Sequence, residues 1–209
     1  MSSPARADDE DARPLSPAQL ALFETPHLQN VSQPETLEYR YVREGGTGFT
    51  DTVAVDVKRI NPDGTKNLSF RYLTGERQIQ VPALDNFRGN PLLMLTLERD
   101  SQEMKDAVGL SSSFFRNKLR EAFVSGASIK ESSFDFAGKA VPAREITVHP
   151  FEHEDRLARL PSLQAKSYTF VLADAVPGGV AEILIQTPAD ATMQTPAFSQ
   201  RTVFSGVKP

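Results

Sequence analysis

The clearest chemical pattern in this sequence is His149-Pro150-Phe151-Glu152-His153, which has the spacing H-x-x-E-H. In one class of zinc peptidases this spacing places two histidines on one helical face, where they bind zinc while the glutamate acts as a base. Here the preceding residues alternate like a strand, so Pro150 at best begins a helix. The sequence also offers no acidic third ligand on a later helix. We therefore favour a loop with two solvated histidines over a zinc peptidase built on His149, Glu152 and His153.

Other residue types that catalyse reactions occur without the neighbours they need. The stretch Gly45-Gly46-Thr47-Gly48 lacks the lysine and the following helix of a phosphate-binding loop, so we predict a hairpin turn there. His27 lies in a proline-flanked loop, and no G-x-S-x-G sequence supplies a nucleophile for a catalytic triad. Acidic pairs such as Glu98 and Asp100 are typical of surface charges in a chain with 27 acidic residues. We predict no catalytic residue, no metal ion and no cofactor.

The composition limits the class of protein. The chain has 209 residues, of which 39% are apolar and 13 are phenylalanine, enough to bury a substantial core. Its net charge of -4 argues against a dedicated nucleic-acid-binding protein. No apolar run reaches the roughly 18 residues of a transmembrane helix. The absence of cysteine excludes disulfides, cysteine catalysis and thiolate metal sites in this sequence.

The elements that must position any site are organised around residues 90–126, where helical periodicity is strongest. Asn90 is a suitable N-cap, Pro91 suits the first helical position, and Gly109 suits the end of the helix. The residues expected on the buried face follow at spacings of three and four: Leu93, Leu97, Ser101, Met104 and Val108. In a competing interpretation a strand runs to about Arg99 and a shorter helix follows. We favour the longer helix.

A second helix is predicted from Ser112 to the glycine at 126. Phe115, Leu119 and Phe123 recur every four residues and form its expected apolar face, while Arg116 and Arg120 share a solvated face. Together the two helices form a predicted helical hairpin, or two helices set at an angle.

The rest of the chain alternates like β-strand. Expected strands cover residues 36–43, 49–60, 66–73, 78–81, 128–136, 140–149, 166–173, 179–187 and 202–204, the last as an edge strand. Phe134 and Phe136 have the opposite parity from Ile129, which predicts a bulge or a late start in that strand. A short helix at 16–23, capped by Ser16, precedes the strands.

These elements predict an α+β fold that is mainly antiparallel β. We expect a curved sheet or half-barrel with an inserted helical hairpin, about 90–126, packed on one face. Residues 1–15 are predicted to be a disordered N-terminus, and residues 16–209 a single β-rich domain.

The first residues contain a pattern of protein export. Ala5-Arg6-Ala7 matches the A-x-A site of a signal peptidase, and the polar run Asp8-Asp9-Glu10-Asp11 follows it. No apolar segment precedes this site, so residues 1–7 would be the tail of a leader whose start codon lies further upstream. We expect export to the periplasm of a bacterium. The alternative is a disordered N-terminus in a cytoplasmic protein.

The apolar residues offer the best candidate binding site. Aromatic residues on neighbouring strands are expected to face apolar residues on the helices: Tyr39, Tyr41, Phe70 and Tyr72 opposite Leu93, Leu97, Phe115 and Phe123. They would line a ligand-sized pocket, or else fill an ordinary core.

Positive charge gathers in the middle third of the chain, at Arg71, Arg77, Arg88, Arg99, Arg116, Lys118 and Arg120. These residues would meet lipid head groups or an acidic partner, or else form local ion pairs on solvated faces.

The arrangement resembles a class of bacterial periplasmic carriers that includes the lipoprotein-localisation factors. The hairpin-like stretches Phe134-Asp-Phe-Ala-Gly-Lys139 and Val176-Pro-Gly-Gly-Val180 contribute to this resemblance. It implies that acyl chains are held between a curved sheet and helices. The localisation factors begin with a long helix, whereas here the helices interrupt the strands, so no functional residue is carried over. Residues 71–77 and 114–120 are similar to segments of uncharacterised exported bacterial proteins.

We therefore predict a soluble periplasmic protein, not an enzyme, that binds a hydrophobic or amphipathic ligand between the sheet and the helices. The ligand would be a lipid or a lipoprotein acyl chain. The alternative is a non-enzymatic envelope interaction or assembly protein that uses a strand edge or the basic helix face.

Overall fold

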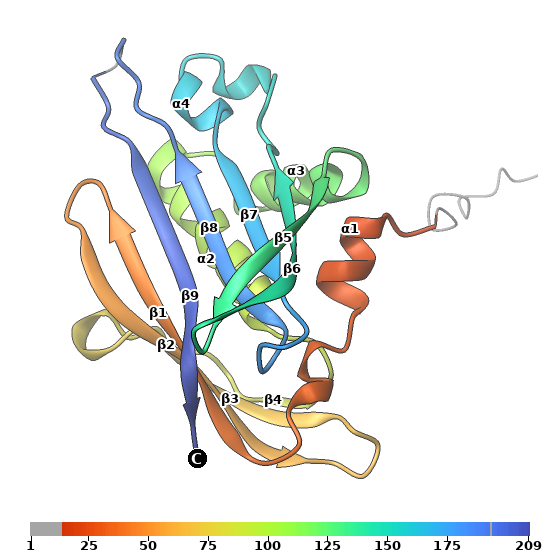
Figure 1. Ribbon diagram of the computed structural model, residues 1–209. Coiled ribbons are helices and arrows are strands. Elements are labelled where there is room, and N and C mark those ends of the chain that lie inside the picture. The colour runs from red at the N-terminus through yellow and green to blue at the C-terminus, as the bar shows by residue number, and fades with distance from the viewer. Residues whose placement is uncertain (1–13, 193) are drawn as a thin grey trace, which may run out of the picture.

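One antiparallel sheet dominates the fold (Figure 1). The computed structural model describes residues 14–192 and 194–209, and within these ranges the sheet has nine strands in the order β4-β3-β2-β1-β9-β8-β7-β6-β5. The strands are β1 (Glu35–Glu44), β2 (Phe49–Ile60), β3 (Lys66–Tyr72), β4 (Leu84–Phe87), β5 (Ser128–Phe136), β6 (Lys139–Val148), β7 (Ser167–Leu172), β8 (Val180–Thr187) and β9 (Phe198–Lys208). With the helices on one face of this curved sheet, the predicted α+β, mainly antiparallel class is confirmed.

Strand β9 joins the two halves of the sheet. It pairs with β1 on one side and with β8 on the other, so the prediction of a short edge strand at 202–204 is wrong. Two residues of β9 that are buried, Gln200 and Thr202, are polar. Because its buried residues are not all apolar, the strand lacks the alternation by which the other strands are recognised.

Most other strands lie where alternation predicts them, and residues 45–48 form the turn between β1 and β2. The strand expected at 78–81 is wrong: a 3-10 helix, Gly75–Arg77, follows β3, and Ile79 makes only an isolated bridge to Tyr72. The bulge expected in β5 is also wrong, because this strand pairs with β6 residue by residue. Ile129 is simply exposed, as an edge strand permits.

The helical hairpin consists of α2 (Leu92–Val108) and α3 (Ser112–Ser125), which cover one face of the sheet (Figure 1). The long first helix is confirmed, and the strand interpretation to Arg99 is wrong. Asn90 Oδ1 accepts a hydrogen bond from the Leu92 N–H at 3.1 Å, which caps the helix start. Gly109 ends the helix with a left-handed φ of 79°, a conformation that costs glycine little.

A short helical segment precedes the sheet and packs beside α3. It comprises α1 (Pro17–Gln19) and one π-helical turn, η1 (Leu20–Glu24), and Ser16 caps it as predicted. The Ser16 hydroxyl also donates a hydrogen bond to the Phe123 carbonyl oxygen at 2.6 Å, which attaches this segment to α3. The remaining short helices are η2 (His27–Asn30), η4 (Asp155–Leu157) and α4 (Pro161–Gln164).

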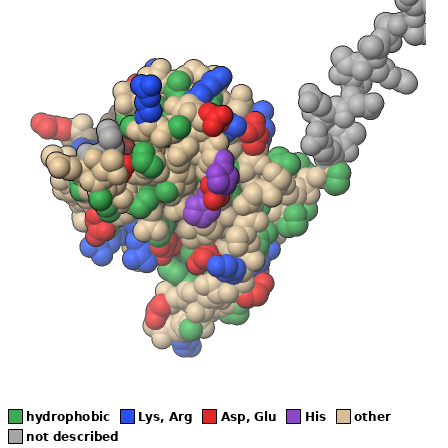
Figure 2. All heavy atoms as spheres, turned by 90° about the horizontal axis from the view of Figure 1, so that it is seen from above, with side chains coloured by type: hydrophobic (Ala, Val, Ile, Leu, Met, Phe, Trp, Pro, Cys, Tyr) green, Lys and Arg blue, Asp and Glu red, His purple; other side chains and the backbone are tan. Residues whose placement is uncertain are grey.

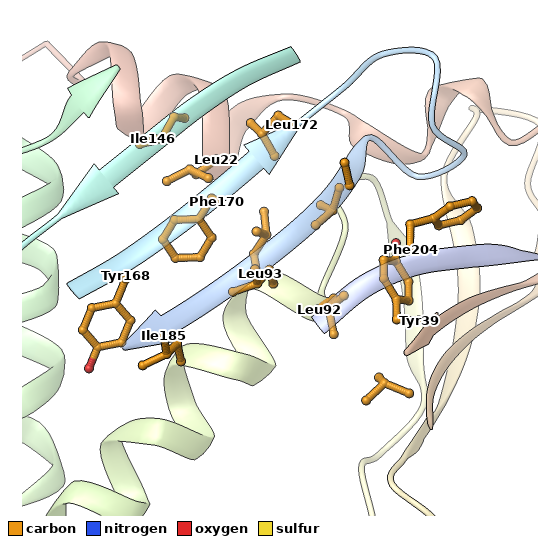
Figure 3. Close-up of a cluster of buried hydrophobic side chains, with 14 of the residues drawn as sticks. Leu22, Tyr39, Leu92, Leu93, Ile146, Tyr168, Phe170, Leu172, Ile185 and Phe204 are labelled. Atoms are coloured by element: carbon orange, nitrogen blue, oxygen red, sulfur yellow. The ribbon is translucent and has the colours of Figure 1, made fainter. Parts of the chain in front are cut away.

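The core lies between the sheet and the hairpin. Figure 3 shows Leu92 and Leu93 of α2 among side chains from β1, β7, β8 and β9. Leu22 of η1 belongs to the same buried cluster. The N-terminal segment therefore contributes to the core as well as to the surface.

The leader-like residues Ala5-Arg6-Ala7 and most of the N-terminal segment predicted to be disordered lie outside the described residues. Within the described ranges, no helix combines the length and the apolar character needed to cross a membrane.

Candidate functional site at the helical hairpin

Helix α2 buries three of the five residues expected on its inner face, Leu93, Ser101 and Met104. Its buried residues are Leu92, Leu93, Thr96, Asp100, Ser101 and Met104. Leu97, expected inside, is only half-buried and lies toward the outer side of the hairpin. The buried face also includes Thr96 and Asp100, because an unpaired buried charge costs more free energy than a half-exposed leucine and Asp100 must lie where its partners are.

Asp100 anchors the middle of α2 to the sheet. Its carboxylate accepts a hydrogen bond from Lys166 Nζ at 2.6 Å and another from the Tyr168 hydroxyl at 2.5 Å. The Lys166 and Asp100 side chains are only 4% and 2% exposed. The prediction that Asp100 is a surface charge is therefore wrong, and its pairing with Lys166 holds α2 against β7.

Arg99 anchors the same turn to the other half of the sheet. Its guanidinium carbon lies 5.5 Å from the ring centre of Tyr41 and 5.1 Å from that of Tyr72. Arg99 Nε donates to Glu103 Oε1 at 2.9 Å, and Gln200 Nε2 of β9 donates to Glu103 Oε2 at 2.9 Å. The inner face of α2 therefore contacts the sheet through polar as well as apolar groups.

Several polar atoms beneath α2 make no hydrogen bond of standard geometry among the described residues. They are Tyr41 OH, Tyr72 OH, Thr96 Oγ1 and Arg99 Nη1. All four belong to the neighbourhood of Arg99. The inner face of α2 therefore buries more polar groups than a purely apolar helix–sheet contact would contain.

Seven of the eight predicted pocket residues belong to one buried core, and Leu97 packs against it half-buried. The buried members are Tyr39, Tyr41, Phe70, Tyr72, Leu93, Phe115 and Phe123. The tyrosines belong to β1 and β3, whereas Phe115 contacts Phe151 and Phe123 contacts Phe170, with ring centres 5.7 and 5.8 Å apart. Strands β9 and β8 lie between β1 and β7, so the two sets of aromatic side chains occupy different parts of this one core.

An open groove lies on the outer side of the hairpin. We call it the outer groove: it is bounded by α1–η1, α2 and α3 and has a volume of about 370 Å³. Its apolar lining residues are Phe23, Met94, Leu97, Leu119 and Phe123, and its polar ones are Gln19, Glu98, Ser101, Arg116 and Arg120. Two predicted pocket residues, Leu97 and Phe123, therefore line a real hollow, but on the outer side of the helices.

Apolar side chains are also unusually exposed around the outer groove. The side chain of Met94 is 59% exposed, and that of Phe23 is 36% exposed. Leu15, Leu20 and Val124, on the same N-terminal segment and α3, are exposed as well. Figure 2 shows hydrophobic side chains on the surface beside the start of the described chain. Such gathering of exposed apolar groups marks a binding surface more often than scattered single residues do.

Most of the basic residues in the middle third form local contacts, as the alternative interpretation holds. Ion pairs join Arg71 to Asp56, Arg88 to Asp63, Arg99 to Glu103, Arg116 to Glu98, and Lys118 to both Glu121 and Glu154. Arg77 stacks on Phe49. Arg120 has no acidic partner among the described residues. The basic helix face is therefore largely neutralised.

The H-x-x-E-H residues form a turn and not a helix. Strand β6 ends at Val148, and His153 has a left-handed φ of 63°. His153 Nε2 lies 3.7 Å from Glu152 Oε1 in an exposed contact. No group of three metal-binding side chains occurs in the part of the chain that the structure describes. The geometry thus favours the loop with solvated histidines.

Comparisons with known proteins give distant similarities of fold. No protein-family model matches the chain, and no curated protein matches it. The fold is similar to the Mycobacterium tuberculosis lipoprotein LppX, with 10% sequence identity, a TM-score of 0.36, and coverage of 92% of this chain and 96% of that chain. It is also similar to a chain in the Pseudomonas aeruginosa MucA/MucB complex, with 14% identity, a TM-score of 0.36, and coverage of 87% and 54%. The chain therefore spans about half the length of that second chain.

Proposed function

We propose that this protein binds the apolar chain of an amphipathic molecule, such as a fatty-acyl chain, in the outer groove. The observation that carries the proposal is the groove itself, an open hollow of about 370 Å³ with apolar walls from three helical elements. The function is binding without catalysis. It keeps the predicted class of ligand but moves the ligand from beneath the helices to their outer side.

The walls of the outer groove combine fixed and adaptable side chains. Leu119 and Phe123 are buried and hold their positions through the core, since Phe123 contacts Phe170 of β7. Met94 is exposed and unbranched, so it can adjust to the shape of a bound chain. A largely pre-formed apolar hollow with a few polar groups at its edge is typical of a small-molecule site.

The interior offers less support for a ligand beneath the hairpin. Tyr168 and Phe170 of β7 are fully buried, and the rings of Phe151 and Tyr168 lie 6.3 Å apart. Asp100, Lys166 and Tyr168 join α2 directly to β7 by hydrogen bonds. An acyl chain in that position would have to separate these bonded groups, whereas the outer groove is open without any rearrangement.

Substitution of Met94 by glutamate tests the proposal. Equilibrium dialysis of the full chain with radiolabelled dodecanoate should show saturable binding, and Met94→Glu should weaken it at least about tenfold, because a charge in the apolar wall opposes transfer of the chain from water. Met94 is 59% exposed, so the fold should tolerate the change.

Ile129→Glu is the matched control, since Ile129 is 39% exposed on β5 and does not line the outer groove. It should leave dodecanoate binding unchanged. Equal affinities of Met94→Glu and the unsubstituted chain would contradict the proposal.

Location in the bacterial envelope remains a prediction that rests on Ala5-Arg6-Ala7. An exported acyl-chain carrier would fit that location. Recovery of the protein from the periplasmic fraction of its source cells would support it, and recovery with cytoplasmic enzymes would contradict it.

A further inference from the structure

Resting on the proposed function, we infer that the ligand of the outer groove carries an anionic head group, which Arg120 and Gln19 bind. Both residues line the polar edge of the groove.

The first two charges at the edge neutralise each other. Arg116 Nε and Nη2 donate to the two carboxylate oxygens of Glu98, both at 2.7 Å. This bidentate pair lowers the pKa of Glu98 and raises that of Arg116, so both remain charged. Gln102 Nε2 donates a third hydrogen bond to Glu98 at 3.3 Å. The pair therefore offers little net charge to a ligand.

Arg120 supplies a charge that no described residue neutralises. It lies four residues after Arg116, on the same face of α3. Its neighbour Glu121 is paired with Lys118 at 3.1 Å. Within the described ranges, Arg120 makes no ion pair or hydrogen bond. The edge of the groove thus carries a net positive charge at this residue.

Gln19 supplies an oriented donor that lines the same groove. Its side-chain oxygen accepts a hydrogen bond from the Ser16 N–H at 2.9 Å as part of the capping box. Because the oxygen has this partner, the amide nitrogen is the end that remains for a ligand. This nitrogen makes no hydrogen bond elsewhere in the described chain.

A guanidinium and an amide N–H are both donors, so they suit an acceptor with more than one oxygen. A carboxylate or a phosphate fits this requirement, and the guanidinium fork binds either with two parallel hydrogen bonds. A hydroxyl head group would satisfy only part of this set, and a quaternary ammonium head would be repelled. The shared chemistry is that of an oxyanion at the end of an acyl chain.

Four probes with the same dodecyl chain test the inference: dodecanoate, dodecyl phosphate, dodecan-1-ol and dodecyltrimethylammonium. In equilibrium dialysis with the full chain, the two anions should bind about fivefold or more tighter than the alcohol, and the ammonium compound weakest. Higher salt should weaken the anions and leave the alcohol unchanged, since salt screens exposed charges. A preference for one anion over the other would identify the head group as carboxylate or phosphate.

Substitutions connect the preference to Arg120. Arg120→Ala should bring dodecanoate and dodecan-1-ol to equal affinity, and Arg120→Lys should keep part of the difference. Arg40→Ala, an exposed arginine on β1, is the control and should change neither affinity.

Two results separate the inference from the proposed function. If dodecan-1-ol binds as tightly as dodecanoate and Met94→Glu weakens both, the groove binds acyl chains but the anionic head group is wrong. If no probe binds, or if Met94→Glu has no effect on any of them, the proposed function itself is wrong.

Discussion

The two faces of α2 each depart from those expected of a helix that covers a core. Its inner face buries Thr96 and Asp100 and pairs Arg99 and Glu103 with residues of the sheet. Its outer face presents Met94 and Leu97 to an open groove. The inner face also buries Leu92, Leu93 and Met104, as an ordinary amphipathic helix would, so the departure lies in these polar and apolar exceptions.

The difference indicates what each face does. Polar contacts on the inner face fix the rotation of α2, because each needs a partner at a defined position, whereas apolar contacts tolerate several rotations. The fixed rotation then leaves apolar side chains on the outside. Exposed apolar side chains on a helix break the usual pattern and bring no evident gain in stability. Such exceptions are expected at functional sites.

The largest predicted effect is a loss of stability at high pH, which depends on the buried tyrosines. All four tyrosines of the chain, Tyr39, Tyr41, Tyr72 and Tyr168, are buried, and burial raises the pKa of each hydroxyl above its ordinary value. Up to about pH 10 both states keep these protons. At higher pH the unfolded chain releases protons that the folded chain retains, so the free energy of unfolding should fall by up to about 1.4 kcal/mol per pH unit for each tyrosine.

The measurement is tyrosinate absorbance and circular dichroism during the same alkaline titration. The absorbance should rise only as the secondary structure is lost. Tyrosines that titrate near pH 10 in a folded chain would show that the inner face is open to solvent.

Removal of the Asp100 carboxylate should have the next largest effect. Asp100→Ala leaves the buried Lys166 ammonium without its partner, and we expect a loss of about 3–5 kcal/mol in the free energy of unfolding, measured by denaturant titration. Asp106→Ala on the same helix is the control, because its side chain is 75% exposed and lies 3.8 Å from Lys105. It should cost at most about 0.5 kcal/mol. A similar small cost for both variants would mean that Asp100 does not anchor α2.

Substitution of Thr96 by valine should have the smallest effect. The Thr96 hydroxyl is buried near the Tyr72 hydroxyl but makes no hydrogen bond of standard geometry among the described residues, so its replacement by a methyl group should change stability by less than about 1 kcal/mol. Thr36→Val is the matched control, because the Thr36 hydroxyl donates to Asp56 Oδ1 at 2.7 Å. That variant should lose about 1–2 kcal/mol. A comparable loss in Thr96→Val would show that its hydroxyl has a partner under α2.

Local patterns in the sequence predict much of the fold. Alternation identifies most strands, and Asn90 and Gly109 mark the two ends of α2. The apolar face of α3 is also correct, since Phe115, Leu119 and Phe123 are its buried residues. These features depend on residues within one or two turns of each other, which a linear pattern contains.

The rest depends on partners that are distant in the sequence. The rotation of α2 is set by Lys166 and Tyr168, which lie 66 and 68 residues after Asp100. The outer groove exists because Ser16 attaches the N-terminal segment to Phe123, 107 residues away. The exposed Leu20, Phe23 and Met94 are local signals that a search for exposed apolar residues could have found, but only after the helix rotation was known.

The methionines provide the most direct test of the outer groove, because two of them lie on different faces of α2. Met94 is 59% exposed and lines the groove, while Met104 is 4% exposed in the core. A nuclear magnetic resonance titration of isotope-labelled methionine methyl groups with dodecanoate, with signals assigned through Met94→Leu and Met104→Leu, reports on both faces at once. We predict that the Met94 signal shifts saturably while the Met104 signal stays in place. A shift of Met104 with an unmoved Met94 would place the ligand between the helices and the sheet and would contradict our account.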